Sequence, residues 1–420
     1  MSTTTSSTTR TAHPWRTAVL AGMASYLDAG AIVTTGIALV LYAATLGIDP
    51  GALGLLSGLL TICFAIGAVI GGRLGDRFGR RRVFTVTLLV FIAGTALLTG
   101  AVATPMLYAG VILVGLAIGA DLPVSLALIA EEAPEGKKGS MIVFSGMLWM
   151  IGILATIVLS IFVAPLGELG GRIMFGQLLL VAVIVVIARR GLRESAEWET
   201  KTGQISLRSA EDEDRITFSG LRQVFAAPVV FALIATGLYY SIWNIGANSF
   251  GQFGTFFFVN LAGTDVQTAS MLNLATFPLG LIGAFVFMRV VDKPARGVFF
   301  VVGTIANVIA YALPLALGFS TLSFTLLLLF FGVGTAFCGE AMYKVWSQEL
   351  FPTLLRSSAQ GITLALARVI AGIVAFGTPA LATGNPSALF GLLAGCALVS
   401  GLIGLFWVPR LRKAVEIEKA

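Results

Sequence analysis

Residues 71–82 read GGRLGDRFGRRR, with five arginines and one aspartate among twelve residues. An apolar run of about residues 52–72 leads into this segment, and another, of about residues 83–103, follows it. Each run has about 20 residues, the length that an α-helix needs to cross the hydrocarbon core of a bilayer. The segment therefore predicts a short polar loop between two membrane-spanning helices.

The composition of the whole chain is that of a membrane protein. Of its 420 residues, 57% are hydrophobic and only 11% are charged, and the mean hydropathy is +0.94. Soluble domains carry roughly a quarter charged residues. This composition excludes a soluble fold, a nucleic-acid-binding module and a disordered chain. The apolar runs are too long for the strands of a β-barrel, which alternate over about 10 residues.

Reading outward from the loop in both directions gives twelve apolar runs, and the fold class is therefore an all-α membrane protein with twelve spans. The runs lie near residues 17–45, 52–72, 83–103, 106–131, 140–164, 173–190, 227–258, 268–290, 298–318, 321–346, 358–381 and 387–408.

The basic residues predict the orientation of these spans. With both termini in the cytoplasm, all of the 27 Lys and Arg residues lie on cytoplasmic segments or helix ends, except Arg172 in an outer loop and Arg368 inside a span. Positive charge collects on the cytoplasmic side of membrane proteins. We therefore expect a multi-pass protein of the inner or plasma membrane with both termini in the cytoplasm.

The longest polar stretch divides the chain into two parts of six spans each. The Ser- and Thr-rich start has no apolar core, so no cleavable signal peptide is expected. The predicted organisation is a leader (1–16), a first six-helix half (17–190), a cytoplasmic linker (191–226), a second six-helix half (227–409) and a tail (410–420).

The two halves look like copies of one another. Asp76 in the loop after run two has a counterpart in Asp292, after run eight. Glu131 and Glu349, each followed shortly by a proline, form a second pair with nearly the same separation along the chain. Two landmarks with nearly the same offset indicate internal duplication, which in transporters places a binding site between the repeats near the bilayer midplane.

The loop resembles the signature G-x-L-x-D-R-x-G-R-[RK] between helices two and three of the major facilitator superfamily. The matching residues are Gly72, Leu74, Asp76, Arg77, Gly79, Arg80 and Arg81. Residues 349–352, ELFP, followed by Arg356, resemble a motif of the sugar porters and related metabolite:proton symporters. The pair Ala367-Arg368 resembles one in helix eleven of organic ion and aromatic acid transporters. The resemblance implies two pseudo-symmetric six-helix halves.

Polar residues of the loops are expected to form a cytoplasmic gate. Arginines can pair with Asp76 and with the carbonyl ends of helices, and such contacts would join the halves in one state and break in another. The alternative is that the bases only anchor the loops at the membrane surface. The candidate gate residues are Gly72, Asp76, Arg77, Gly79, Arg80, Asp292, Arg296, Glu131, Glu349 and Arg356.

Four ionisable side chains fall inside spans, where each costs about 2.5–3.5 kcal/mol on insertion scales. Asp28 and Asp121 are the candidates for proton coupling. The alternative is that both carboxylates only hydrogen-bond to neighbours. Val111 stands where many relatives carry an arginine, so neither acid has an obvious basic partner in the first half.

The other two ionisable residues, Glu340 and Arg368, lie at equal depth in runs ten and eleven. They either form a structural ion pair, or Arg368 binds a substrate carboxylate that Glu340 helps to orient. In run seven, polar and aromatic side chains suited to a sugar, polyol or aromatic acid complete the substrate-binding candidates. These are Tyr240, Trp243, Asn244 and Asn248, and Asn244 corresponds to Asp28 by the offset between Asp76 and Asp292.

Together these residues predict a secondary active transporter that moves a small polar metabolite, a sugar or polyol first, by alternating access with proton symport. The alternatives are an organic anion or aromatic acid:proton symporter, a drug efflux antiporter and a non-transporting receptor. No phosphate-binding G-x-x-x-x-G-K-[ST] loop or catalytic constellation is found, so neither ATP-driven transport nor an enzyme is expected. We expect no cofactor, metal or nucleic acid, and a monomer in the bilayer with a small-molecule substrate and protons as partners.

Overall fold

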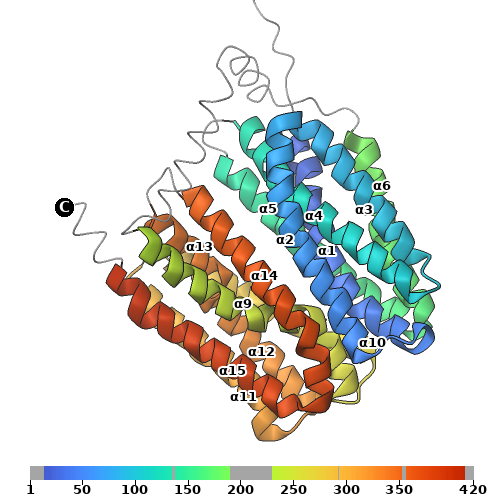
Figure 1. Ribbon diagram of the computed structural model, residues 1–420. Helices are drawn as coiled ribbons and strands as arrows, with labels where there is room; N and C mark the ends of the chain where they lie inside the picture. Colours follow the sequence, from blue (N-terminus) through green and yellow to red (C-terminus); the bar gives the residue numbers. More distant parts are fainter. Residues whose placement is uncertain (1–13, 135–137, 190–228, 292, 352–355, 412–420) are drawn as a thin grey trace, which may run out of the picture.

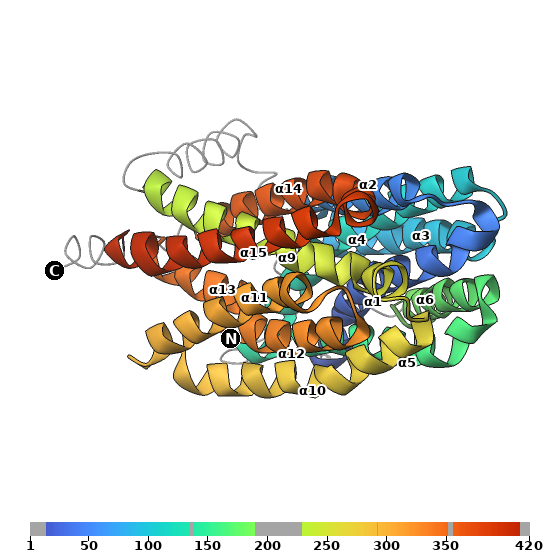
Figure 2. The same ribbon diagram turned by 90° about the horizontal axis from the view of Figure 1, so that it is seen from below.

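The computed structural model describes residues 14–134, 138–189, 229–291, 293–351 and 356–411. Within these ranges, twelve helices are long and apolar enough to cross a membrane. Figures 1 and 2 show them as two bundles side by side, α1–α6 in one and α9–α15 in the other. The predicted twelve spans in two six-helix halves are confirmed. The linker, the leader before residue 14 and the tail after residue 411 lie outside the described residues.

The first half consists of α1 (Pro14–Leu46), α2 (Pro50–Phe78), α3 (Arg80–Thr99), α4 (Thr104–Glu132), α5 (Lys138–Val163), the 3-10 turn η1 (Ala164–Leu166) and α6 (Glu168–Arg189). The second half consists of α9 (Val229–Asn260), α10 (Val266–Val290), α11 (Arg296–Leu317), α12 (Thr321–Cys338), α13 (Glu340–Glu349), α14 (Arg356–Gly384), α15 (Pro386–Leu402) and the π-helical turn η2 (Ile403–Trp407).

The second helix of each half begins in the same way. The Asp49 carboxylate accepts a hydrogen bond from the backbone N–H of Ala52 (2.6 Å), and that of Asp265 accepts one from Thr268 (2.8 Å). Both aspartates are N-caps, which satisfy backbone donors that the first helical turn leaves free. The hydrogen bonds from Thr268 hold the pKa of Asp265 below its ordinary value. The two caps are related by the same sequence offset as Asp76 and Asp292.

The halves touch each other mainly at the end of the bundle away from residues 14 and 411. Across the interface α2 packs on α14, α1 on α9 and α5 on α10. One apolar cluster there includes Leu56 of α2, Phe253 of α9 and Ala375 of α14. Nearer the described ends of the chain, each half has a separate core, around Phe84 in the first and Trp346 in the second. The halves are therefore joined at the far end and have separate cores at the near end.

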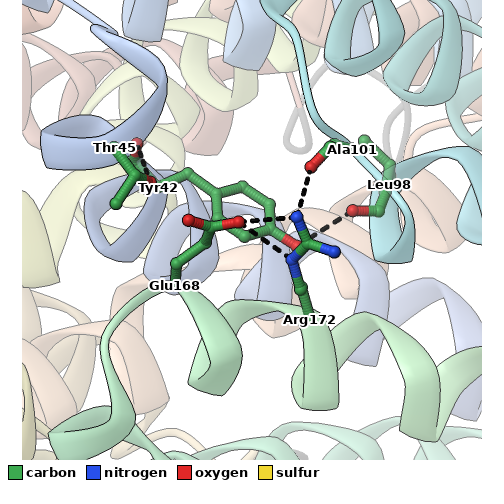
Figure 3. A network of polar contacts seen from close by, with 6 residues as sticks. All are labelled: Tyr42, Thr45, Leu98, Ala101, Glu168 and Arg172. Atoms are coloured by element: carbon green, nitrogen blue, oxygen red, sulfur yellow. Dashed lines mark hydrogen bonds and ion pairs between the residues drawn. The ribbon is translucent and has the colours of Figure 1, made fainter.

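A polar network holds the far end of the first half together (Figure 3). The Arg172 guanidinium pairs with Glu168 (Nη2–Oε1, 2.6 Å) and donates to the carbonyl of Ala101 (2.9 Å). The Tyr42 hydroxyl donates to the carbonyl of Leu98 (2.9 Å). The network ties α1, the end of α3 and α6 together. Arg172, expected in an outer loop, lies in the first turns of α6, where Glu168 compensates its charge.

The tenth apolar run, predicted as one continuous helix, is broken. Helix α12 ends at Cys338 and α13 begins at Glu340, with Gly339 between them in a non-helical conformation. A Cβ at position 339 would collide with the carbonyl of Thr335 and with the ring of Trp243. Glycine is therefore required for this close approach between the break and α9, and the break places Glu340 at a helix N-terminus.

Candidate functional site

Asp28 is a buried carboxylate on α1 that is influenced by charges of the second half. Its Oδ1 has no hydrogen-bond partner among the described residues. The indole of Trp149 on α5 interacts with it, as do the charges of Arg368 on α14 and Glu340 on α13. The basic residue that acts on Asp28 thus belongs to the opposite half of the protein.

Asp121, on α4, is equally buried but lies within a network of its own half. It accepts a hydrogen bond from the Thr87 hydroxyl (2.9 Å), and the charge of Arg189 acts on it. Arg189, also buried, donates from Nε to the carbonyl of Leu20 (2.9 Å), and its Cζ lies 3.0 Å from the centre of the Phe84 ring. Arg189 acts on Asp121 only through its charge, since no ion pair within 4 Å joins the two among the described residues. Arg189 lies at the end of the sixth apolar run, and the distribution of positive charges predicted that it lies at the cytoplasmic surface.

Glu340 pairs with a residue that the sequence did not single out. Its Oε1 lies 2.7 Å from Nζ of Lys344, one turn further along α13. The Tyr240 hydroxyl donates to Oε2 (3.3 Å). The Lys344 and Glu340 side chains are 57% and 42% exposed, so this ion pair is not sealed in the protein interior.

Arg368 forms no ion pair with Glu340 within 4 Å, so the first of the two alternatives, a direct pair, is not seen in the described part of the chain. The guanidinium instead reaches toward the first half, with Cζ 5.0 Å from the centre of the Phe64 ring on α2. It influences Glu340 and Asp28 only through its charge. Within the described ranges, the positive group between the halves is therefore not directly neutralised by a carboxylate.

The aromatic candidates of α9 are packed inside the second half. The Tyr240 ring stacks on that of Tyr343 (centroids 4.2 Å apart) and, more distantly, on that of Trp243 (6.0 Å). Tyr240 and Trp243 are buried in the core cluster of that half. Their contacts are those of a packed core beside Glu340, and Tyr240 reaches the candidate site through its hydroxyl.

The amides of α9 form a polar stripe toward the first half. Asn244, Asn248 and Gln252 follow at four-residue spacing and therefore share one helix face. The Gln252 amide donates to Asn248 Oδ1 (2.9 Å) and to the Thr61 hydroxyl of α2 (2.8 Å). Gln252 and Thr61 were not among the candidates, although the four-residue spacing in run seven points to Gln252.

Helices α1 and α9 cross at equivalent residues. A Cβ on Gly36 would collide with the backbone carbonyl of Gln252, and these two positions are related by the offset that links Asp76 to Asp292. Asp28 and Asn244 each precede this crossing by eight residues, or about 12 Å along a helix. Asp28 and Asn244, which are related by the sequence offset, thus lie at the same depth on helices that pack together.

Many buried polar atoms on these helices and their neighbours have no hydrogen-bond partner among the described residues. An unpartnered buried polar group costs roughly 1–3 kcal/mol, so such a set needs water or a ligand. On the interface helices and their neighbours, these atoms are Asp28 Oδ1, Thr34 Oγ1, Thr35 Oγ1, Ser57 Oγ, Thr156 Oγ1, Gln177 Oε1, Asn244 Oδ1, Asn248 Nδ2 and Gln252 Oε1.

Most of the expected gate lies beyond the described side chains. The side chains of Asp76, Arg77, Glu131 and Arg356 lie outside the described part of the chain. Of Gly72 only the helical backbone is described, and Asp292 lies wholly outside the described residues. Their role stays a prediction.

The remaining gate candidates can be placed. Gly79 connects α2 to α3 with φ +93°, and Arg80 begins α3. Arg296 pairs with Glu349 through two N–O contacts (2.7 and 3.2 Å), which links α11 to α13 inside the second half. No group of three or more metal-ligating His, Cys, Asp or Glu residues occurs within the described ranges.

Comparison with known families and proteins places this architecture among membrane transporters. The family described as "Major Facilitator Superfamily" matches residues 18–376. The chain is 32% identical over 399 residues to the "Minor myo-inositol transporter IolF" of Bacillus subtilis (strain 168), covering 93% of this chain and 90% of the relative. It is 25% identical over 374 residues to the "Putative niacin/nicotinamide transporter NiaP" of the same strain, covering 85% and 86%.

Two solved structures show the same fold. The crystal structure of a D-xylose-proton symporter has a TM-score of 0.77 at 18% identity, with 95% of this chain and 99% of that chain covered. An inward open conformation of the xylose transporter XylE from E. coli has a TM-score of 0.73 at 17% identity, with 94% and 97% covered.

Proposed function

The chain belongs to the major facilitator superfamily of membrane transporters, and we propose that it carries a sugar or polyol across the membrane by alternating access, coupled to protons. The family and the twelve-helix fold are those of transporters and not of enzymes. The relative described as a minor myo-inositol transporter, 32% identical over nearly the whole chain, supports a cyclic polyol as the first substrate to test.

The class of substrate is inferred from the unpartnered polar atoms. Four of the nine are carboxylate or amide oxygens, which accept, four are hydroxyl oxygens, which both donate and accept, and Asn248 Nδ2 donates. Hydroxyl groups both donate and accept, so a polyol satisfies such a mixed set. A carboxylate can only accept, and it would also meet the negative charges of Asp28 and Glu340. This mixed set and the two carboxylates therefore favour a neutral substrate that carries hydroxyl groups.

One observation supports an organic anion as the second candidate. Among the described residues, the guanidinium of Arg368 has no carboxylate within 4 Å, and it lies between the halves. Arginine binds carboxylates through two parallel hydrogen bonds, so such a guanidinium is suited to an acid. Glu340 and Asp28 weigh against this candidate, because their charges would repel the substrate.

The distribution of the cores supports alternating access. The halves share a core at the far end and have separate cores at the near end. With the termini in the cytoplasm, as the positive charges favour, this arrangement faces inward. Rocking one half against the other would open the far end.

Uptake into proteoliposomes tests the proposal. The purified protein is reconstituted, and labelled myo-inositol, xylose and benzoate are offered with and without an imposed pH gradient. We expect the gradient to drive accumulation of the polyol or sugar, and Asn244→Ala to raise the KM, whereas Gly251→Ala on the same helix leaves it unchanged. Accumulation of benzoate alone, lost in Arg368→Gln, would instead establish an organic anion transporter. Equal uptake of all three with no gradient dependence would contradict proton-coupled transport.

A further inference from the structure

The ion pair on α13 lies within a membrane-spanning segment and is not buried. Glu340 and Lys344 both belong to the candidate span Thr321–Ser347. Nζ of Lys344 lies 2.7 Å from Oε1 of Glu340, and the two side chains are 57% and 42% exposed. Charged groups inside a span are expensive against lipid, and they face the bundle interior or a water-filled cavity. The pair therefore faces a polar space within the protein.

The Lys344 side chain points away from the membrane surface. Helix α13 begins at Glu340 and ends at Glu349 at the near end of the bundle, so its first residue lies about 14 Å further along the helix than its last. A lysine close to the end of a span normally extends its charge outward to the membrane surface. Lys344 instead reaches back by one turn to Glu340. Its ammonium group is thus held inside the protein by a partner at greater depth.

The remaining faces of α13 are packed against the second half. The hydroxyls of Tyr343 and Thr363 are hydrogen-bonded, which joins α13 to α14. The Trp346 ring packs against that of Tyr239 on α9, with centroids 4.8 Å apart. These contacts fix the rotation of α13 about its own axis. The ion pair is therefore presented on the face that the packing leaves open.

The ion pair adjoins the polar stripe of α9. The Tyr240 hydroxyl donates to Oε2 of Glu340 (3.3 Å), and Tyr240 precedes Asn244 by one turn. Tyr240, Asn244, Asn248 and Gln252 follow one another at four-residue spacing and share one face of the helix. The pair thus continues this row of hydrogen-bonding groups toward the near end, where the halves have separate cores.

The fold itself does not require charges at these two positions. The separation between Glu131 and Glu349 relates Glu340 and Lys344 to Leu122 and Leu126 of the first half. Both leucines are partly exposed, so the equivalent helix presents an apolar surface at the same place. The charged pair is therefore a property of the second half alone and distinguishes the two sides of the transport path.

Both members of the pair retain hydrogen-bonding capacity. An ammonium has three N–H donors, and a carboxylate has about four acceptor positions. Among the described residues, Glu340 is the acceptor that Lys344 meets, and Glu340 itself accepts from Lys344 and Tyr240. Free donors and free acceptors therefore lie side by side in a unit without net charge. Two adjacent hydroxyl groups match this unit, because one can accept from the ammonium while its neighbour donates to the carboxylate.

We propose that Glu340 and Lys344 form a diol subsite, which binds two adjacent hydroxyl groups of the substrate at the near end of the α9 stripe. The inference rests on the sugar or polyol transport proposed above. Hydroxyl groups bind while the ion pair stays intact, whereas a carboxylate or an amine would compete with one member for the other. The subsite therefore selects a neutral substrate that carries a 1,2-diol.

Removal of single hydroxyl groups from the ligand, combined with removal of each member of the pair, tests the subsite. Binding of myo-inositol and of each of its monodeoxy analogues to the purified full-length protein is measured by competition against labelled myo-inositol. We expect the loss of either of two adjacent hydroxyls to weaken binding to the unmodified protein about tenfold. One of these losses should have no further effect in Lys344→Met, and the other none in Glu340→Gln, as a double-mutant cycle requires.

Two further variants control for charge and folding. Lys344→Arg keeps a charged donor and should retain the discrimination between the ligands, also where Lys344→Met fails to fold. Arg410→Gln removes an exposed cation after α15 and should leave every affinity unchanged. Melting in detergent is recorded for each variant, so that loss of binding is separated from loss of fold.

Hydroxyl losses that weaken binding equally in the unmodified protein and in both variants would overturn the subsite and leave the pair as a contact that only stabilises α13. Sensitivity at two hydroxyls that are not adjacent would overturn the diol geometry. If the unmodified protein binds no polyol or sugar at all, the proposed function fails and the subsite with it. Polyol binding that Lys344→Met leaves unchanged would overturn the subsite alone.

Discussion

Ser160 on α5 donates a hydrogen bond to Ser270 on α10, with 2.8 Å between the two Oγ atoms, and so joins the two halves at the far end of the bundle. A second serine pair, Ser25 on α1 and Ser145 on α5, has nearly the same separation of 2.7 Å but lies inside the first half. Under the alternating access proposed above, transport would break the first of these contacts and leave the second in place.

Cysteines at these two serine pairs should have opposite effects on transport. In a background with the three native cysteines replaced by alanine, oxidised Ser160→Cys/Ser270→Cys should stop uptake, because a disulfide holds sulfurs about 2.05 Å apart and keeps the far end closed. Reduction should restore it. Oxidised Ser25→Cys/Ser145→Cys should still transport. Uptake by the oxidised interface pair equal to that of its reduced form would show that the far end does not open.

Gly36→Ala should destabilise the arrangement seen here by about 1–3 kcal/mol, the usual range for overpacking. The added Cβ would collide with the Gln252 carbonyl at the crossing of α1 and α9. Gly251→Ala is the matched control, since a Cβ there meets nothing within 4 Å. Melting in detergent measures both. An unchanged melting temperature for Gly36→Ala would mean that the two helices are not in this contact in solution.

Asp28→Asn should abolish accumulation driven by a pH gradient but retain counterflow exchange, which needs no net proton movement. Asparagine is nearly isosteric with aspartate but cannot exchange a proton. The control is Asp265→Asn, because asparagine serves as an N-cap as well as aspartate does. Undiminished accumulation in the Asp28 variant would place the proton site elsewhere.

Removing Glu340 or Arg368 should have little effect on stability. Glu340 pairs with Lys344 at partly exposed positions, and such pairs contribute roughly 0–1 kcal/mol. Glu340→Gln and Arg368→Gln should therefore each change the free energy of unfolding by less than about 1 kcal/mol.

Arg189→Gln provides the contrast, since it removes a buried guanidinium that donates to the Leu20 carbonyl and should cost about 1–3 kcal/mol. The double variant Glu340→Gln/Arg368→Gln, measured with the two single variants, completes a double-mutant cycle. A large loss in both singles that the double recovers would reveal a direct buried pair.

Arg172→Ala should lower the melting temperature and leave substrate affinity unchanged. The substitution removes the hydrogen bond to the Ala101 carbonyl and the pair with Glu168 (Figure 3), which together contribute about 1–3 kcal/mol. Arg172→Lys should recover part of the loss. If Arg172→Ala alters the KM for substrate, the network reaches further into the protein than its contacts show.

The sequence was sufficient for the architecture because bilayer thickness fixes the length of every span. The twelve runs, the two halves and the constant offset between them follow from hydropathy and from polar landmarks in loops. The same offset relates Asp28 to Asn244, and each lies eight residues before the crossing of α1 and α9. The N-cap residues Asp49 and Asp265 are related by the same offset and could have been found by the same comparison.

Side-chain partners were harder to predict, because they depend on rotation about helix axes and on local breaks. Arg189 lies at a helix end, and only the structure shows its side chain turned inward toward Asp121. The break at Gly339 changes the direction of Glu340, which then meets Lys344 on its own helix and not Arg368. Equal depth in two spans therefore did not establish an ion pair.

The crossing of Gly36 with Gln252 has a consequence for the ancestry of the fold. In a dimer of identical chains, a residue on the two-fold axis meets its own copy. Two glutamines at this crossing would collide with the opposing backbone, and two glycines would leave no amide to reach Thr61. Two identical copies of either half could not form this contact, which needs glycine on one side and glutamine on the other. The contact therefore requires that the two halves differ in sequence where they meet.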